Sequence, residues 1–399
     1  MTQESILVIN TGSSSLKLGL YVNDGSDEKL LFDGLADGIG RDDGTIVLRG
    51  DGGSVLRSEA LHRGTQEEAL KKCVGWLKEL SIATPLAIGH RVVHGGPNLT
   101  EHQRITPELL RELRAAVHFA PIHVPMALSL IAAAEQAYPQ VDQFACFDTA
   151  FHRTLPEVAA RFPLPRALFD KGIRRYGFHG LSYESIVHRL GDDLPPRTVI
   201  AHLGNGASIA AVSNGCSIDT TMGLTPLGGI PMATRSGDLD PGVLLYLMRT
   251  GHADAEALEQ MLNHDAGLQA ISGGVSDMRT LEAKAANGDA EAQLAIRIFC
   301  TAIRKVVAGY AAVLGGLDLL VFTGGIGEHS ARVRGDVCQD LEFMGVSVDT
   351  AKNLKPDGNI AAASSKVRLR VMTSEEDRQI ARHCRSMIVE STKLNRPVD

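Results

Sequence analysis

Residues 6–21 read ILVINTGSSSLKLGLY, and this stretch decides the fold class of the chain. An apolar run at residues 6–9 precedes the small polar residues 10–15, after which leucines alternate with Lys17 and Gly19. Alternation with a period of two predicts a half-buried strand, and a Gly- and Ser-rich turn between two such runs predicts a β-hairpin. Because the turn joins strand to strand, it differs from the Gly-rich loop that opens a helix in P-loop and Rossmann folds.

The turn of this hairpin has the chemistry of an anion site. Gly12 and the serines at 13–15 expose backbone N–H groups and hydroxyls, and Lys17 adds a cation beside them. Such donors suit an oxygen-rich anion, of which phosphate is the usual example. For this stretch alone, a surface hairpin with a Ser-rich tip is an equal alternative.

The composition excludes several classes of protein. A chain of 399 residues is long enough for two domains. The net charge of −7, with 44% hydrophobic residues and no basic block, is typical of a soluble globular protein that does not bind nucleic acid. The six cysteines lack CxxC spacing, which argues against zinc and disulfides and indicates a reducing cytoplasm.

Neither a signal peptide nor a membrane span is expected. The chain enters the first strand without a preceding basic or long apolar segment. The longest apolar-rich segment, residues 291–314, contains Arg297, Arg304 and Lys305, so we expect a core helix there.

The order of the predicted elements indicates an internal duplication. In the first half we expect further strands at 29–35, 45–48, 86–94 and 141–148, and helices at 66–80, 107–117 (with Thr106 as N-cap) and 125–138. In the second half we expect a strand–turn–strand at 197–213, helices at 242–249, 254–263 and 291–314, and strands at 317–323 and 367–372. Two hairpin-first halves predict two similar domains that face each other across a ligand cleft.

Two more Gly-rich turns favour a nucleotide. Residues 202–208, HLGNGAS, repeat the small residues of the first turn after another strand. Residues 323–327 follow a further strand and are expected to open a helix near Glu328, where free N–H groups favour a phosphate. Three such turns in one chain make nucleotide binding the preferred interpretation.

Charged side chains in apolar or glycine-rich surroundings add candidate catalytic groups. Arg91 lies within an apolar strand and needs an anionic partner there, while Asp148 ends another strand. His179 lies between aromatic residues and glycines, and Arg235 lies in a long irregular segment. Glu375 and its neighbour at 376 are either metal ligands or the acidic first turn of the last helix. Two arginines, a histidine and a carboxylate beside phosphate-binding turns suit phosphoryl transfer.

Seven motifs together resemble the acetate kinase family. They read VINTGSSSLK, GHRVVHGG, FDTAFHRTLP, YGFHGLSY, HLGNGASIAAV, TPLGGIPMATRSGDLDPG and FTGGIGEHS, in the order of that family and over nearly the whole chain. The resemblance implies an α/β fold with two ribonuclease H-like domains, as in the acetate and sugar kinase, chaperone and actin superfamily, facing each other across a nucleotide cleft. The implied bounds are 1–147 with 377–399, which supply a returning C-terminal helix, and 148–376, which carry most nucleotide contacts.

The resemblance also implies an activity and its partners. The reaction is the reversible transfer of a phosphoryl group from ATP to acetate, giving ADP and acetyl phosphate. The implied metal cofactor is Mg²⁺, with Mn²⁺ as an alternative. The expected assembly is a cytoplasmic homodimer without nucleic-acid or membrane partners.

The site residues carried over by position fall into four groups. The catalytic residues are Arg91, Asp148, His179 and Arg235, of which Arg91 binds the acyl carboxylate and Asp148 is the acid/base or organises Mg²⁺. Val93, Ile122 and Pro226 line the pocket for the methyl group, and Asn10 and Glu375 hold the metal. The nucleotide contacts are Lys17, His202, Leu203, Gly204, Asn205, Gly206, Asp277, Met278, Arg279, Gly325, Ile326, Gly327, Glu328 and His329.

Three departures from the family pattern leave the substrate open. Gly228 stands where many members have glutamate, His329 where asparagine is frequent, and Ile122 where leucine is usual. Since one methylene in such a pocket is worth only ~1–3 kcal/mol, a propionate or other short-chain acyl kinase is the alternative within the enzyme class. An actin- or chaperone-like ATPase and a nucleotide-binding regulator are the alternatives from other classes.

Overall fold

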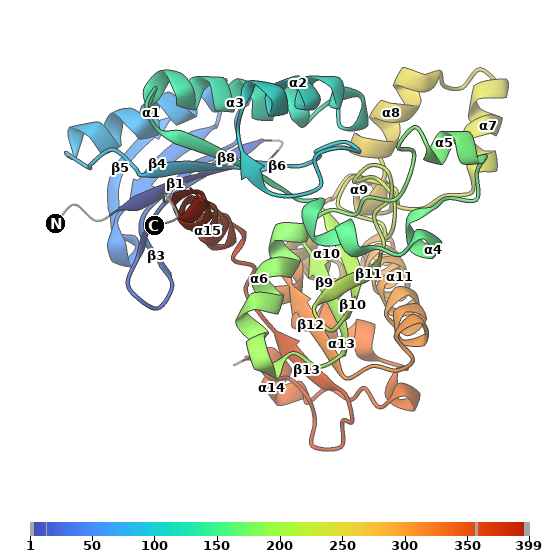
Figure 1. Ribbon diagram of the computed structural model, residues 1–399. Coiled ribbons are helices and arrows are strands. Elements are labelled where there is room, and N and C mark those ends of the chain that lie inside the picture. The colour runs from blue at the N-terminus through green and yellow to red at the C-terminus, as the bar shows by residue number, and fades with distance from the viewer. Residues whose placement is uncertain (1–3, 13, 356–357, 395–399) are drawn as a thin grey trace. The chain divides into compact units, whose positions relative to one another are not determined.

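The computed structural model describes residues 4–12, 14–355 and 358–394, and the chain divides into two compact units. Unit 1 comprises Met1–Ala150 and Glu375–Asp399, and unit 2 comprises Phe151–Ser374 (Figure 1). The expected bounds differ from this division by a few residues, so that Asp148 belongs to unit 1. Ser13 at the hairpin tip and residues 395–399 of the expected first domain lie outside the described residues.

Unit 1 is built on one mixed sheet with the strand order β5-β4-β3-β2-β1-β6-β8-β7. The opening hairpin is confirmed, since β1 and β2 pair antiparallel, while β1, β6 and β8 are parallel neighbours. The short strands β5 and β7 were not predicted from the sequence. The strands are β1 (Ser5–Thr11), β2 (Ser15–Asn23), β3 (Glu28–Asp37), β4 (Thr45–Arg49), β5 (Val55–Ala60), β6 (Ala87–Val92), β7 (Gln103–Arg104) and β8 (Asp142–Phe147).

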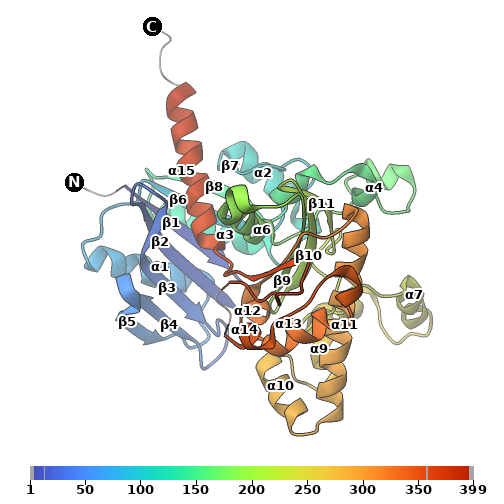
Figure 2. The same cartoon turned by 90° about the horizontal axis from the view of Figure 1, so that it is seen from below.

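Helices cover both faces of this sheet. Helices α1 (Gln66–Glu79) and α3 (Val124–Ala137) pack on one face, where Leu7 and Ile9 of β1 join their core. Figures 1 and 2 show α15 (Glu376–Leu394) along the other face. Helix α2 (Pro107–Ala115) begins as predicted, because the Thr106 side chain accepts a hydrogen bond from the Leu109 N–H at 3.2 Å.

The returning helix α15 is held closely to unit 1. A Cβ at Gly89 of β6 would lie 2.5 Å from Ile380 Cγ2 and 2.6 Å from Cys384 Sγ, so only glycine permits this approach. The guanidinium of Arg382 donates to both carboxylate oxygens of Asp27, at 2.6 and 2.7 Å. Asp27 is the residue directly before β3.

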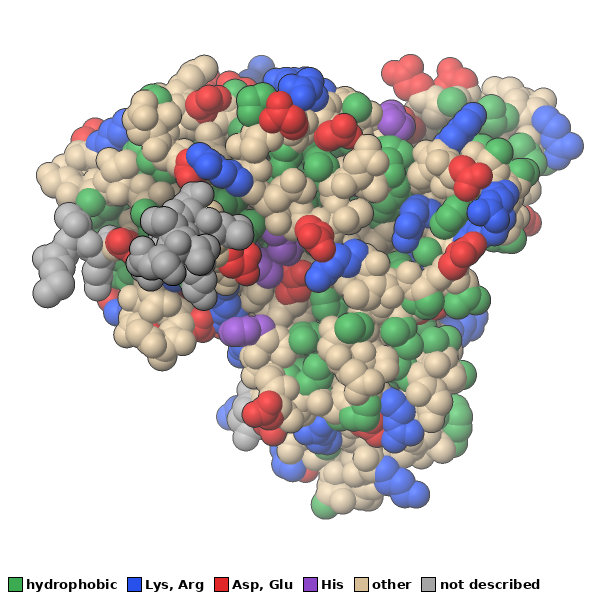
Figure 3. Space-filling view, in the orientation of Figure 1, with side chains coloured by type: hydrophobic (Ala, Val, Ile, Leu, Met, Phe, Trp, Pro, Cys, Tyr) green, Lys and Arg blue, Asp and Glu red, His purple; other side chains and the backbone are tan. Residues whose placement is uncertain are grey.

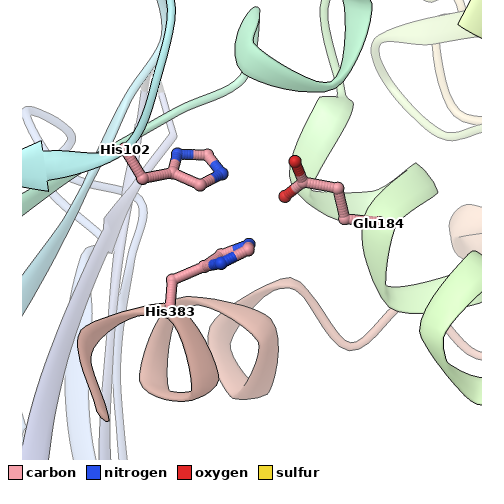
Figure 4. A group of neighbouring side chains, drawn as sticks. All are labelled: His102, Glu184 and His383. Atoms are coloured by element: carbon pink, nitrogen blue, oxygen red, sulfur yellow. The ribbon is translucent and has the colours of Figure 1, made fainter. Parts of the chain in front are cut away.

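A ring contact adds to these interactions of α15. The imidazole of His383 lies against that of His102, with ring centroids 4.1 Å apart (Figure 4). His383 also contacts Gln379, four residues earlier on the same helix, at 3.1 Å. Glu184, which Figure 4 also labels, belongs to unit 2. The ring contact therefore joins α15 to the segment around β7.

Unit 2 is built on a five-stranded sheet with the order β11-β10-β9-β12-β13. Asn214 and Gly215 both have positive φ, as a type I′ turn between β10 and β11 requires. Helix α11 (Ala290–Leu314) packs against β9 and β10, and the buried Tyr183 of α6 (Gly180–Leu190) belongs to a core cluster with residues of the same sheet. The strands are β9 (Arg197–Leu203), β10 (Ala207–Ser213), β11 (Cys216–Thr220), β12 (Leu319–Thr323) and β13 (Arg368–Val371).

Most of the remaining helices of unit 2 were not predicted from the sequence, and one begins earlier than predicted at a Gly-rich turn. The helix after β12 was expected to open near Glu328, but α12 (Gly324–His329) already begins at the first glycine. The others are α4 (Glu157–Ala160), α5 (Arg166–Phe169), α7 (Pro241–Arg249), α8 (Ala255–His264), α9 (Gly267–Ile271), α10 (Met278–Ala286), α13 (Ala331–Cys338) and α14 (Thr350–Leu354).

The two sheets repeat one topology. The series β3-β2-β1-β6-β8 and β11-β10-β9-β12-β13 each have two antiparallel pairings followed by two parallel pairings. In both series the opening hairpin supplies the centre of the sheet. The repetition confirms the expected α/β fold with two related domains.

Charged side chains are distributed over the surface of both units. Acidic and basic side chains are interspersed over the visible faces of both units, without a broad basic area (Figure 3). Within the described ranges, every helix is too short or too polar to cross a lipid bilayer.

We predict that stability falls below pH 6.5 because of two buried histidines. Burial lowers the pKa of His90 in unit 1 and of His152 in unit 2 to about 4. The unfolded chain therefore binds more protons between pH 6.5 and 4, which costs about 2 kcal/mol per histidine at pH 5. In chemical unfolding, His90→Gln should reduce the stability difference between pH 7.5 and pH 5, whereas His264→Gln on the surface should not. Equal differences in both variants would contradict the prediction.

Candidate active site

A buried ion pair occupies the carboxyl end of the unit 1 sheet. The guanidinium of Arg91 donates to both Asp148 oxygens, with Nε at 3.0 Å from each and Nη2 at 2.6 Å from Oδ2. Burial by itself lowers the pKa of Arg91, but the charges of Asp148 and Glu376 outweigh it and raise the pKa above its usual value. These bonds use only part of the five N–H donors of a guanidinium, so Arg91 can also bind a second anion.

Asn10 extends this cluster to the end of β1. Its Oδ1 accepts a hydrogen bond from Arg91 Nη1 at 3.1 Å, and its amide donates to Asp377 and, at 3.5 Å, to Glu376. Glu375 instead binds Arg378, and it also lies 3.8 Å from Arg382. The side chain of Asn10 thus meets Glu376, one of the two possible metal ligands named from the sequence, and Asp377, which the sequence did not single out.

The residues around Asn10 fit a divalent cation. Burial raises the pKa of Asp377, against the lowering effects of the Asn10 hydrogen bond and the Lys17 charge. A cation would stabilise the ionised form of such a carboxyl. An amide oxygen and carboxylates are ligands suited to Mg²⁺, which usually takes one or two carboxylates together with substrate phosphates.

Three further candidates of unit 1 lie around this cluster. Lys17 is the cross-strand partner of Asn10 in the β1–β2 hairpin and has an exposed side chain. Val93, directly after β6, is half-buried, and Ile122 is 41% exposed. An apolar side chain this exposed remains available to line a small pocket.

In unit 2, two Gly-rich turns lie side by side. The turn Gly204–Gly206 joins β9 to β10, and a Cβ at Gly204 would lie 4.0 Å from the Gly325 N–H nitrogen. Gly324 has φ +75°, and a Cβ there would lie 2.8 Å from the Leu203 carbonyl oxygen, so glycine is required. The backbone N–H groups of α12 and of this turn therefore come together, as expected for a phosphate site.

His179 and Arg235 converge on the same turn. A Cβ at Gly206 would lie 3.3 Å from His179 Nε2 and 3.6 Å from Arg235 Nη1. Arg235 Nη1 also donates to the Pro226 carbonyl at 3.2 Å. His179 has φ +59°, a left-handed conformation that costs a non-glycine residue of order 1–3 kcal/mol and is typical of functional sites.

Serine hydroxyls lie within hydrogen-bond distance of Nδ1 in both His179 and His202. His179 Nδ1 lies 2.8 Å from Ser208 Oγ, which is 2.5 Å from the Tyr183 hydroxyl. The ring of His202 stacks on that of His179 with centroids 4.3 Å apart. The same arrangement holds His202, whose Nδ1 lies 2.8 Å from Ser182 Oγ. Ser182, Tyr183 and Ser208 were not predicted from the sequence as supporting residues.

A helical pattern could have indicated one of them. Tyr183 follows His179 by four residues, the spacing that places two side chains on one face of a helix. By contrast, the position of Ser208 depends on the pairing of β10 with β9. Local spacing in the sequence therefore could not predict the contact between Ser208 and His179.

The other nucleotide candidates occupy two helix starts. Asp277 is the N-cap of α10, and Met278 and Arg279 form its first turn, where Arg279 is 91% exposed. Ile326, Gly327 and His329 lie within α12. Glu328 accepts hydrogen bonds from the N–H groups of Gly324 and Ser374, each at 3.0 Å, and so fixes the start of α12. Asn205 lies within the turn after β9 and accepts a backbone hydrogen bond from Ala233.

Comparisons with known proteins identify acetate and propionate kinases as relatives of this chain. The chain is 42% identical over 397 residues to an acetate kinase from Methylocella silvestris, covering 96% of this chain and 98% of that one. It is 41% identical to a propionate kinase from Citrobacter rodentium, covering 94% and 95%. Among solved structures, a propionate kinase from Francisella tularensis matches with a TM-score of 0.88 and 36% identity, covering 95% and 98%.

The family model of the acetokinase family matches residues 5–382. This range contains all the candidate residues described above in both units. The near-complete coverage by relatives of about the same length agrees with that match. The chain therefore belongs to the acetokinase family.

Proposed function

We propose that this protein transfers the γ-phosphoryl group of ATP to acetate, giving ADP and acetyl phosphate, in a reversible reaction. The observation that carries the proposal is the convergence of His179 Nε2 and Arg235 Nη1 on the Gly206 turn. An arginine cation and a histidine ring nitrogen beside one phosphate-binding turn suit a transition state whose charge is spread over phosphoryl oxygens.

In the proposed reaction, a carboxylate oxygen of acetate attacks the γ-phosphorus in line. A new O–P bond forms as the bond from phosphorus to the ADP oxygen breaks. Since the attacking oxygen is already anionic and ADP leaves as an anion, the step needs no proton transfer. The main task of the protein is to reduce the repulsion between two anions.

Arg91 is the proposed ligand of the acetate carboxylate. Its bonds to Asp148 fix the guanidinium in the buried end of the sheet while part of its donors stay available. We therefore assign Asp148 the role of orienting Arg91, rather than that of a strong general base. Val93, Ile122 and Pro226 are the proposed lining of the methyl pocket.

The nucleotide and metal assignments complete the proposal. The turns at Gly204–Gly206 and Gly324–Gly327, together with Lys17 and the start of α10, are proposed to bind the phosphates and nucleoside of ATP. Asn10 with Glu376 and Asp377, or with Glu375, would hold Mg²⁺. When bound, the cation would neutralise charge on the nucleotide phosphates.

Propionate is the second candidate substrate, because a propionate kinase is nearly as similar to this chain as the acetate kinase is. The two acids differ by one methylene, which a hydrophobic pocket discriminates by only 10- to 200-fold. The presence of Ile122 where leucine is usual gives no strong preference, since the two residues have the same volume.

The first prediction from this proposal is a preference for acetate. With ATP, Mg²⁺ and hydroxylamine, trapping of the acyl phosphate as a hydroxamate should give kcat/KM for acetate above that for propionate, and far above that for butyrate. A higher value for propionate would keep the mechanism and reassign the substrate. If the protein binds ATP but makes no hydroxamate from any acid, the kinase proposal is refuted.

Removing Arg235 should abolish turnover. By comparison with arginines that stabilise phosphoryl-transfer transition states, Arg235→Ala should reduce kcat by ~10³–10⁵. ADP binding measured by calorimetry should change little, because the phosphate-binding N–H groups remain. Arg332→Ala is the matched control, since Arg332 lies on α13 of the same unit and pairs with Asp336 at the surface. A kcat above a tenth of the wild-type value would contradict the role.

We also propose that the protein forms a homodimer through α7 and the segment around α4. Helix α7 has no buried residue, although Leu245 and Tyr246 are apolar and 58% and 57% exposed. The segment around α4, residues 153–175, contains a surface hollow of about 550 Å³. Val158 and Leu164, which line this hollow, are exposed. Apolar surface of this kind is typical of an interface.

The charges of the segment around α4 and of the segment that contains α7 and α8 support a second copy of the chain as the partner. Residues 153–175 contain six basic and two acidic side chains, whereas residues 238–265 contain six acidic and one basic. In a two-fold dimer, each segment can meet the complementary segment of the partner.

Light scattering after size exclusion tests this surface. The wild type should have twice the 42.6 kDa of the chain. The double variant Leu245→Asp with Tyr246→Asp should give the monomer mass, because two desolvated carboxylates at an apolar contact are costly. Val389→Glu, which changes an apolar residue of α15 that is 47% exposed, should remain dimeric. A monomeric wild type, or a dimeric double variant, would refute the surface.

We propose that the protein is located in the cytoplasm, because its cysteines form no disulfide bonds. All six are free thiols, and five of them are buried as small apolar residues. Free thiols persist in a reducing compartment.

A further inference from the structure

We propose that Ser208, which accepts a hydrogen bond from Tyr183, is a positioning residue that holds His179 in one tautomer, with the proton on Nε2. The inference rests on the proposed function only for its effect on catalysis. The contacts themselves join α6, the strand β10 and the residue directly before α6.

The three groups form a single line of hydrogen bonds. The Tyr183 hydroxyl lies 2.5 Å from Ser208 Oγ, and Ser208 Oγ lies 2.8 Å from His179 Nδ1. Tyr183 and Ser208 are fully buried, so bulk water does not supply other partners. Among the described residues, Ser208 Oγ is the group that hydrogen-bonds the Tyr183 hydroxyl.

Only one direction of the line satisfies every buried hydrogen. If Tyr183 donates to Ser208, the serine hydrogen is directed to Nδ1, which must then be an acceptor. If His179 donated from Nδ1 instead, either the phenol hydrogen or the serine hydrogen would lack an acceptor. Leaving a buried donor unsatisfied disfavours these arrangements by roughly 5- to 150-fold.

The preferred direction has a consequence at the phosphate-binding turn. With Nδ1 as acceptor, the neutral imidazole carries its proton on Nε2, the atom that lies 3.3 Å from a Cβ at Gly206. His179 then presents an N–H donor beside Arg235, toward the place proposed for the transferring phosphoryl group. A ring with the other tautomer would present a lone pair to an anion, which is repulsive.

Two independent features hold the ring in this orientation. The left-handed backbone of His179 directs the side chain from the start of α6, and the ring of His202 stacks on it at 4.3 Å. The second ring is itself fixed by Ser182. Rotation of His179 about its side-chain bonds is thereby restricted, so the tautomer decides which hydrogen bond the ring offers.

The direct test is the tautomer of His179 in the ligand-free protein. Histidine labelled with ¹⁵N, with His179→Gln to assign the signals, reports which ring nitrogen carries the proton at pH 8. The wild type should show the proton on Nε2, and so should Tyr183→Phe, because Nδ1 is then the acceptor left for the serine hydrogen. Ser208→Ala should give a mixture of both forms, because no hydroxyl then donates to Nδ1. Ser185→Ala is the matched control, since that buried serine of α6 donates to the Ser182 carbonyl. A proton on Nδ1 in the wild type, or an unchanged ratio in Ser208→Ala, would overturn the inference.

Kinetics test the catalytic consequence separately. Ser208→Ala should lower kcat about 10- to 100-fold, as loss of a supporting hydrogen bond to a functional histidine does elsewhere, with KM for ATP unchanged. Ser208→Thr, which keeps the hydroxyl, should recover most of kcat. Equal losses in both variants would indicate a packing effect and refute the role. If the wild type itself makes no acyl phosphate, the proposed function fails, while the tautomer measurement still decides the inference.

Discussion

The ion pair between Arg91 and Asp148 is the interaction on which the rest of unit 1 depends. Two charges in a buried place are tolerable only when they satisfy each other, and removal of one partner leaves the other at high cost. Arg91 lies on β6 and Asp148 directly follows β8, while Asn10 reaches Arg91 from β1. The pair therefore requires β1, β6 and β8 as parallel neighbours, and it connects the order of the strands to the chemistry at their ends.

The repeated topology gives unit 2 a comparable edge with different chemistry. In both sheets the candidate site residues follow the carboxyl ends of neighbouring parallel strands, which is where open α/β sheets usually bind ligands. The edge of unit 1 collects charged side chains, whereas that of unit 2 collects glycines and backbone N–H groups around β9 and β12. Under the proposed function, one layout supplies a site for a carboxylic acid in one copy and a site for phosphates in the other.

Much of the fold could be predicted because its signals are local. The hairpin at residues 6–21, the capped start of α2 and the Asn214–Gly215 turn each follow from neighbouring residues. The start of α12 was predicted wrongly, since a run of glycines indicates a turn although tertiary packing holds it in a helix.

The candidate site was less accessible to sequence reasoning. Arg91, His179 and Arg235 stood out as charges among apolar or small residues, but their partners lie far away along the chain. Which carboxylate meets Asn10 depends on the rotation of α15, and Ser208 meets His179 through strand pairing. Neither relation leaves a pattern in a single sequence, and the assignment of site residues by family resemblance stays a prediction.

The return of α15 to the first sheet has a consequence for biosynthesis. A nascent chain emerges from its N-terminus, so β1 to β8 are made first, all of unit 2 follows, and the helix that covers Gly89 comes last. Unit 2 is contiguous and can complete its core while one face of the first sheet still lacks its cover. During that interval this apolar face is exposed to chaperones and to aggregation, and the last helix of the chain ends the exposure.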